Sequence, residues 1–402
     1  MRIDAFHKTV ASLALTSIGD RLASAKTTLP WLLGVVGAPT WCAGLLVPIR
    51  ESGSMLPQIF IAKRVRRLAV RKWMWVGGSG VQAMSLFAMA WAGVALTGVA
   101  AGMAVLLLLA LFSLGRAASS LASKDVMGKT IAKERRGRLN GWKSAIAGIG
   151  VMAAGAGLGL VGDSGNAMVY GMILAGAAML WVIAGVIFAT IEEPRDQETA
   201  ADDDGAASAL SKMRMLWDDA RLRRFVIARA LAMGTGLAAP YYLILARGDL
   251  ASGVAALGLF IVAEGLAGAI SAPVWGRWAD RSSRAVFAFG CALAALLSVA
   301  VAAWSWWGAG EGASRVFYPL VFFALGLAHA GVRIGRKTHL VNMAEGNQRT
   351  DYVAVSNTAM GVLLLGTGVV SALASLVSVE GTLVVLAMAG LAGAWLGMRW
   401  SS

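Results

Sequence analysis

Long runs of apolar residues, separated by short polar stretches, extend along almost the whole chain. A helix that crosses the hydrocarbon core of a bilayer needs about 20 mostly apolar residues. By this criterion the pattern predicts twelve spanning helices, which we expect near residues 9–32, 38–61, 73–93, 102–123, 142–161, 168–190, 223–246, 253–275, 286–307, 317–337, 353–376 and 380–398. The first is the least apolar, because Asp20, Arg21 and Lys26 interrupt it.

Basic residues gather in alternate connections between the predicted spans. The connection after 38–61 carries Lys63, Arg64, Arg66, Arg67, Arg71 and Lys72. Further basic clusters follow 102–123 and 253–275, whereas the connections on the opposite side contain only Arg247 and Arg315 as cations. Loops rich in lysine and arginine stay on the cytoplasmic side of a membrane. We therefore expect both chain termini in the cytoplasm.

Composition narrows the class of protein. Of the 402 residues, 58% are hydrophobic and 14% are charged, whereas soluble proteins carry about 25% charged residues. These values predict an integral membrane protein, and the richness in alanine and glycine is typical of a bacterial inner membrane. The net charge of +14 does not indicate nucleic-acid binding, because the basic residues lie in short clusters between apolar runs.

The sequence also lacks the usual marks of an enzyme or a cofactor protein. Cys42 and Cys291 both fall inside apolar segments, which predicts neither a disulfide framework nor a metal site. No GxxxxGK[ST] loop is present, so ATP is not the expected energy source. Three histidines and no convincing nucleophile–base spacing make a membrane acyl or glycosyl transferase the disfavoured alternative.

The stretch from Ile191 to Phe225 is polar and charged, and it divides the chain. Its acidic part is expected to be a solvated linker, and Ser208 to Arg224 could form an amphipathic helix at the inner membrane surface. The predicted domains are therefore an N-terminal six-helix bundle, a cytoplasmic linker and a C-terminal six-helix bundle, at residues 1–190, 191–222 and 223–402. Paired halves are common among transporters, with the binding site near the midplane between them.

Several predicted spans carry charges, and VPIRESGSMLPQIFIAKRVRR is the clearest case. Glu51 lies about ten residues from the inner end of its span, roughly 15 Å, which is close to the bilayer midplane. A charge there costs about 2.5–3.5 kcal/mol on insertion scales, so it must face protein or a wet cavity. Glu51, Ser54 and Gln58 form one stripe by helical spacing. Arg50 lies on the adjacent flank and is expected to bond to another helix.

Each charge within a span has a structural alternative to a functional role. Arg50 and Glu51 either hold helices together or couple transport to an ion, and the same two roles are open for Asp20. Arg116 either binds an anionic group or neutralises Asp20. Glu264 has no nearby cation in the sequence, which favours a carboxyl that binds and releases a proton. Arg333 and Arg336 approach the inner end of their span, where snorkelling is favoured.

The loop GRWADRSSR, Gly276 to Arg284, resembles the signature loop of the major facilitator superfamily. The resemblance implies an all-α fold of twelve transmembrane helices in two pseudo-symmetric six-helix bundles. It also implies a cytoplasmic gate formed by Gly276, Asp280, Arg281 and Arg284. The equivalent first-half loop, IAKRVRRLAVRK, lacks the aspartate, and GIGVMAAGAGLGL lacks the proline of the family's antiporter signature.

Together these features predict a secondary transporter of a small polar solute that works by alternating access, coupled to protons. The candidate residues for substrate binding and coupling are Asp20, Arg50, Glu51, Arg116, Glu264 and Arg333. The expected partners are a small molecule, the lipid bilayer and a proton, with no metal, cofactor or nucleic acid. A lipid or drug transporter of the same fold and a non-transporting sensor or partner subunit remain as alternatives.

Overall fold

The computed structural model describes residues 4–57, 61, 68–160, 166–195, 213–250, 253–308, 310–343 and 348–400. These residues form helices and contain no β-strand. The first half of the chain forms α1 (Ala5–Leu22), α2 (Thr28–Val35), α3 (Thr40–Met55), α5 (Lys72–Ala95), α6 (Gly98–Thr130), a 3-10 turn (Lys133–Arg135), α7 (Arg136–Leu160) and α8 (Ala167–Ala189). The second half forms α10 (Met215–Asp218), α11 (Ala220–Leu231), α12 (Gly234–Asp249), α13 (Val254–Arg281), α14 (Ser283–Trp307), α15 (Glu311–Met343), α16 (Gln348–Ser375) and α17 (Val379–Met398).

Two of the predicted spans are broken. The prediction of one helix at 9–32 is wrong, because residues 23–27 separate α1 from α2. The span predicted at 223–246 is likewise divided, with Ala232 and Met233 between α11 and α12. Short unwound segments inside a membrane protein are tolerated where they are buried or line a cavity. Both breaks therefore identify places where a site can form.

The amphipathic helix expected from Ser208 to Arg224 is not continuous. Residues 208–212 lie outside the described chain, and the backbone is extended at Asp219, between α10 and α11. The Asp219 carboxylate accepts hydrogen bonds from the backbone N–H groups of Arg221 and Leu222, so it caps the N-terminus of α11. A good N-cap residue at this position interrupts the predicted helix and starts a new one.

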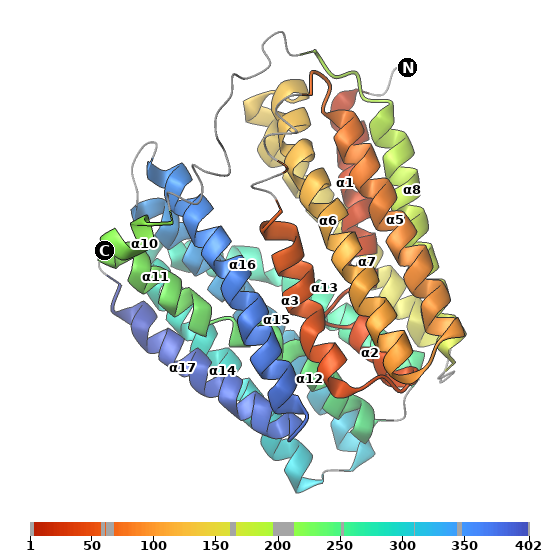
Figure 1. Ribbon diagram of the computed structural model, residues 1–402, viewed down its shortest axis with the longest axis vertical. Helices are drawn as coiled ribbons and strands as arrows, with labels where there is room; N and C mark the ends of the chain where they lie inside the picture. Colours follow the sequence, from red (N-terminus) through yellow and green to blue (C-terminus); the bar gives the residue numbers. More distant parts are fainter. Residues whose placement is uncertain are drawn as a thin grey trace.

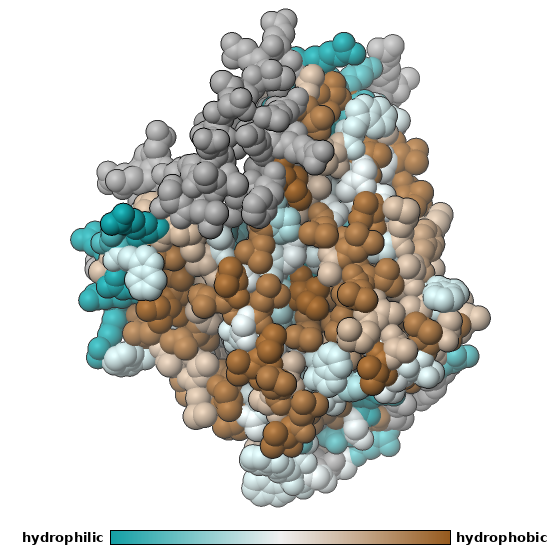
Figure 2. Space-filling model, viewed as in Figure 1, coloured by the Kyte–Doolittle hydropathy of each residue, from teal (hydrophilic) through white to brown (hydrophobic). Residues whose placement is uncertain are grey.

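Eight of the described helices are long and apolar enough to cross a membrane, namely α6, α7, α8 and α13 to α17. The other predicted spans correspond to α1–α2, α3, α5 and α11–α12, which are shorter or more polar. Large apolar side chains such as Trp91, Leu107, Met172 and Met388 are exposed on the surface. Figure 2 shows much of the visible face in brown, the colour of hydrophobic residues. The chain is an integral membrane protein.

The helices pack mostly within each half of the chain. Helix α5 lies against α6 and α8, and α14 lies against α15 and α17. Between the halves, α3 packs on α16, α7 packs on α13, and α12 packs on α2 and α3. In Figure 1 most helices of the first half, in red to yellow, lie on the right, and α16 and α17, in blue, lie on the left.

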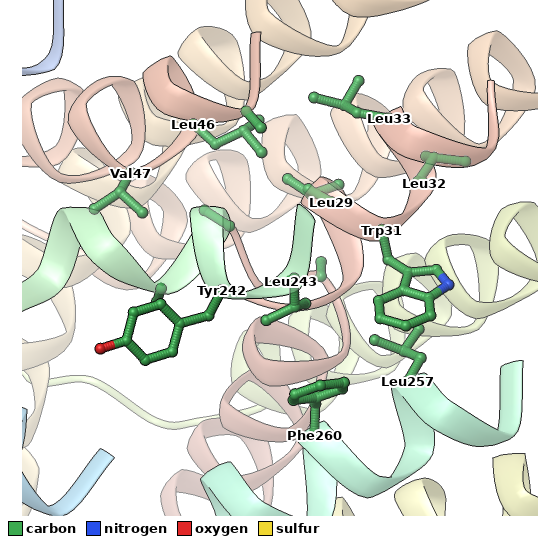
Figure 3. Close-up of a cluster of buried hydrophobic side chains, with 14 of the residues drawn as sticks. Leu29, Trp31, Leu32, Leu33, Leu46, Val47, Tyr242, Leu243, Leu257 and Phe260 are labelled. Atoms are coloured by element: carbon green, nitrogen blue, oxygen red, sulfur yellow. The ribbon is translucent and has the colours of Figure 1, made fainter. Parts of the chain in front are cut away.

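One buried apolar cluster joins the two halves. It includes Trp31 and Leu32 of α2, Tyr242 of α12, and Leu257 and Phe260 of α13, and Figure 3 shows Trp31 and Leu257 side by side with Phe260 below them. Helices α2 and α12 lie toward the end of the molecule opposite the N-terminus (Figure 1). The four other clusters of the described residues each lie within a single half. Apolar packing therefore joins the halves mainly at the end away from the chain termini.

Candidate functional site

A cavity of about 310 Å³ lies between the two halves. Its described lining comes from α1, α3 and α6 in the first half and from α11, α12, α13, α15 and α16 in the second. Lys26, in the break between α1 and α2, and Met233, in the break between α11 and α12, also line it. Its charged lining residues are Arg21, Lys26, Glu51, Arg116, Arg229, Glu264, Arg333 and Arg336.

The end of α1 is fixed against α13 at the cavity wall. Arg21, in the last turn of α1, donates a hydrogen bond from Nη1 to the backbone carbonyl of Glu264 at 3.2 Å. A Cβ atom added at Gly268, one turn further along α13, would lie 2.9 Å from Nη2 of Arg21. Glycine at 268 therefore leaves the room that the guanidinium occupies, and the contact joins the two halves beside the cavity.

Asp20 lies behind this wall and bonds to two arginines. Nη2 of Arg50 is 2.6 Å from Oδ1 of Asp20, and Nη1 of Arg116 is 3.1 Å from the same atom. Arg50 also donates to the backbone carbonyls of Asp20 and Ala23, at 3.0 and 2.6 Å. These carbonyls belong to the C-terminal end of α1, which has no helical partner for them. Arg50 thus holds the break in the first span, and its acidic partner is Asp20 rather than Glu51.

The two carboxylates of the cavity differ in their surroundings. Neither Glu51 nor Glu264 makes a side-chain hydrogen bond or an ion pair with another described residue. The charge of Glu51 interacts with those of Lys26, Arg116, Arg333 and Arg336, whereas that of Glu264 interacts with Lys26. The predicted stripe is only partly described, because Gln58 lies outside the described residues. Glu51 therefore interacts with more basic side chains than Glu264 does.

Three arginines of the second half complete the basic wall. Arg229 of α11 is buried and donates to Ser356 Oγ at 2.6 Å and to Asn357 Oδ1 at 3.1 Å, both on α16. Arg333 and Arg336 of α15 line the cavity, and neither forms an ion pair with an acid in the described chain. Snorkelling toward the inner end, the role favoured for them from sequence, stays a prediction.

Comparisons with solved structures give the same architecture. No protein-family model matches the chain, and no curated protein matches it. A variant of the nucleoside transporter NupG matches with a TM-score of 0.79 at 13% identity over 99% of this chain and 100% of that one. A D-xylose–proton symporter gives 0.72 at 12% identity over 99% and 98%, and a variant of a POT peptide transporter gives 0.69 at 14% over 100% and 98%. The chain has the fold of the major facilitator transporters. At these sequence identities the structural similarity shows the fold.

The helices differ in whether they line the cavity. Helices α5, α8 and α17, at the third, sixth and twelfth predicted spans, contribute no described residue to the cavity. The charges that the sequence placed within spans lie instead on lining helices. Helices α3 and α11 are too short to span a membrane alone, with 16 and 12 residues, and α1, α3 and α11 all contribute charged residues to the cavity.

The loop that resembles the facilitator signature lies at the end of α13 and the start of α14. Arg284 donates from Nη1 to the backbone carbonyl of Trp400 at 2.8 Å, beyond the end of α17. Asp280 and Arg281 are exposed and have no hydrogen-bond partner in the described chain. Gly276 lies in the last turns of α13 with no atom near its Cβ direction. The gate implied by the resemblance is not closed in this structure and stays a prediction.

The first half carries a polar cluster at the corresponding place that the sequence did not predict. The Glu193 carboxylate accepts hydrogen bonds from the backbone N–H groups of Arg71 and Lys72, at 3.0 and 2.7 Å, at the start of α5. Lys129 of α6 lies 3.0 Å from the same carboxylate, whose side chain is fully buried. Arg71 also pairs with Asp125 at 3.3 Å. Glu193, expected in the linker, is therefore tied to the first half.

Proposed function

We propose that this protein is a secondary transporter of small polar solutes and that it works by alternating access. The observation that carries the proposal is a charged cavity between two halves that apolar packing joins mainly at one end. In this proposal residues 1–190 and 223–402 are two six-helix bundles that rock about the cavity. The present arrangement is then the state in which the cavity faces the end that carries the chain termini.

The solved structures of the same fold favour a polar solute. Their printed names describe a nucleoside transporter, a D-xylose–proton symporter and a transporter of the POT family in complex with 5-aminolevulinic acid. All of these solutes are polar, and the cavity of this chain has eight charged residues in its lining. A lipid or an apolar drug would leave these charges without compensation, which is costly in a site of low dielectric constant.

We infer the orientation from the basic connections. Placing the termini in the cytoplasm of a bacterium puts the open end inside and the apolar cluster around Trp31 and Phe260 outside. The loop with Asp280, Arg281 and Arg284 then lies at the inner face. There it would close against a neighbouring helix end when the halves approach each other in the outward-facing state.

Proton coupling is assigned to Glu264 rather than to Glu51. Both carboxylates line the cavity, and the charge of Glu51 interacts with those of four basic side chains. Glu264 makes no side-chain hydrogen bond or ion pair with another described residue, and we propose it as the carboxyl that binds the transported proton. Asp20 is engaged by Arg50 and Arg116 and is proposed to be structural.

Uptake into proteoliposomes as a function of pH tests this assignment. Glu264→Gln should retain solute exchange at equal pH on both sides and lose uptake driven by a proton gradient. Glu51→Gln, the matched control in the same cavity, should remain sensitive to the gradient. Gradient-driven uptake by Glu264→Gln with unchanged pH dependence would refute the coupling role. If no solute of any kind crosses the membrane with folded protein, the alternative of a non-transporting sensor or subunit is favoured.

A further inference from the structure

We propose that the solute is a small anion that carries two or more carboxylate or phosphate groups. This inference rests on the proposed transport function and names the class of solute that the same cavity takes. Six basic side chains line the cavity against two carboxylates, an excess of four positive charges. Adding the Asp20–Arg50 pair behind the wall leaves this excess unchanged, because it contributes one charge of each sign.

The excess has no compensation within the described chain. Asp20 engages Arg116 and Arg50, and Glu51 is shared among several cations. Arg229 is satisfied only by the neutral groups of Ser356 and Asn357. Cations gathered in one cavity repel one another unless an anion joins them. A bound anion is the simplest partner that meets this requirement.

The geometry of the basic groups favours oxygen anions over a single point charge. Five of the six cations are arginines, whose planar forks bind carboxylate and phosphate through two parallel hydrogen bonds. They come from both halves, with Arg21 and Arg116 in the first and Arg229, Arg333 and Arg336 in the second. A solute with anionic groups at two positions can bond to both halves at once. Bonding both halves at once is what a transported solute needs in order to stabilise the closed intermediate.

The size of the cavity limits the solute. Pockets for small molecules range over roughly 300–1,000 Å³, and this cavity, at about 310 Å³, lies at the lower end. It suits a metabolite of the size of a short dicarboxylic acid or a sugar phosphate rather than a peptide or a large drug. The two acids of the lining, Glu51 and Glu264, can bind one proton or one cationic group of the same solute.

The charge of the cavity can be measured without knowing the solute. Met233, in the break between α11 and α12, lines the cavity and is partly accessible, whereas the native Cys42 and Cys291 are buried. We would label Met233→Cys with two thiosulfonate reagents of similar size, one anionic and one cationic, each rate normalised to that of a free thiol. Clefts lined by charges of one sign change encounter rates by roughly 10–1,000-fold. The anionic reagent should therefore react at least tenfold faster.

Two charge-removing variants show which residues cause the preference. Arg333→Gln combined with Arg336→Gln should lower the ratio of anionic to cationic labelling at least threefold. Arg315→Gln, a control at the opposite end of α15, removes an exposed cation that does not line the cavity and should leave the ratio unchanged. Equal rates for the two reagents, or faster reaction of the cationic one, would overturn the proposal.

Protection of the same cysteine identifies the class of solute. Succinate, 3-phosphoglycerate and pyrophosphate, each with two anionic groups, should together include compounds that slow labelling by a neutral maleimide, whereas dimethyl succinate, glycerol and choline should not. Protection by neutral or cationic compounds alone would overturn the anion proposal, and flux of those compounds would leave the transport function intact. An anionic preference with protection but no flux of any protecting compound would refute the transport function and keep the assignment of an anion site.

Discussion

Replacing Asp20 by asparagine should destabilise the first half of the protein, although a carboxyl near the bilayer midplane invites a role in transport. The carboxylate is the acidic partner of Arg50 and Arg116. Only 6% of the Arg50 side chain is exposed, against 30% for Asp20 and 33% for Arg116. The variant keeps the shape of the side chain and removes the charge, which leaves the buried Arg50 cation with neutral acceptors alone, the new amide oxygen and two backbone carbonyls.

The size of the effect follows from these exposures. Removing one partner of a buried ion pair costs about 3–5 kcal/mol, whereas an exposed pair contributes about 0.2–1 kcal/mol. Arg50 keeps two carbonyl acceptors and Asp20 is partly exposed, so we expect a loss near the lower end, about 3 kcal/mol. Arg116, at 33% exposure, adds less than about 1 kcal/mol to this loss. A loss of about 3 kcal/mol increases the population of locally opened protein roughly a hundredfold.

The native cysteines provide the assay. Cys42 is buried on α3, the helix that carries Arg50, and Cys291 is buried in the second half. In Asp20→Asn the labelling of Cys42 by a small thiol reagent in detergent should accelerate roughly a hundredfold, and that of Cys291 should accelerate much less. Glu51→Gln, next to Arg50 in the chain but without an ion pair, should change neither rate by more than about threefold. Unchanged labelling of Cys42, or equal acceleration by Glu51→Gln, would refute the structural role of Asp20.

Three further predictions concern other parts of the molecule. Glu193→Gln should cost about 2 kcal/mol, because it weakens charge-assisted hydrogen bonds of a buried carboxylate; the exposed Glu192→Gln should have no effect on the thermal midpoint in detergent. Gly258→Leu should sharply reduce the yield of monodisperse protein, because its Cβ would overlap a backbone oxygen of α7. Its control is Gly157→Leu on α7, whose Cβ would have no atom within 4 Å, and this variant should be tolerated. Asp219→Ala should remove about 1 kcal/mol of helix capping. Partial burial raises the pKa of Asp219, but its hydrogen bonds hold the pKa below the usual value. The charged carboxylate therefore stabilises the fold at neutral pH, and this stability is lost on protonation. The difference in stability between Asp219→Ala and wild type should be present at neutral pH and vanish as the pH falls below about 4.

The sequence predicted the membrane class and the positions of most helices because hydrophobic runs of spanning length are a direct requirement of the bilayer. It placed the charges of the cavity on the correct helices for the same reason, since a charge within a span must avoid lipid. The breaks at 23–27 and 232–233 were missed, although Lys26 already marked the first. A break costs little where neighbouring groups satisfy the backbone, and those neighbours come from distant parts of the chain.

The partners of the charged residues could not be predicted from one sequence. Arg50 lies one position from Glu51 but bonds to Asp20, thirty positions away in the chain, because the rotation of α3 turns it toward the end of α1. Arg336 lines the cavity between the halves, which its position near the inner end of its span did not predict. Glu193 was expected in the linker, and only the fold places it over the N-terminus of α5. Helix rotation is set by packing, which the periodicity of a single helix does not contain.

A cross-link at the closed end tests the central claim, that the halves rock about the cavity, most directly. An ideal Cβ at Gly44 of α3 would lie 3.3 Å from Cβ of Ala372 on α16, close to the distance of about 3.5–4.5 Å in disulfides. Gly44→Cys and Ala372→Cys would be combined with Tyr241→Phe, which removes the hydroxyl nearest to the new side chain. The Met233→Cys reporter then measures access to the cavity from each side of the membrane.

With the disulfide formed, a membrane-impermeant thiol reagent should label the reporter only from the side that carries the termini. After reduction, labelling from the opposite side should rise at least tenfold, because the halves can separate there. Each single cysteine variant, which cannot form the cross-link, serves as the control and should behave like the reduced protein. Labelling from the opposite side that persists with the disulfide formed would contradict the account.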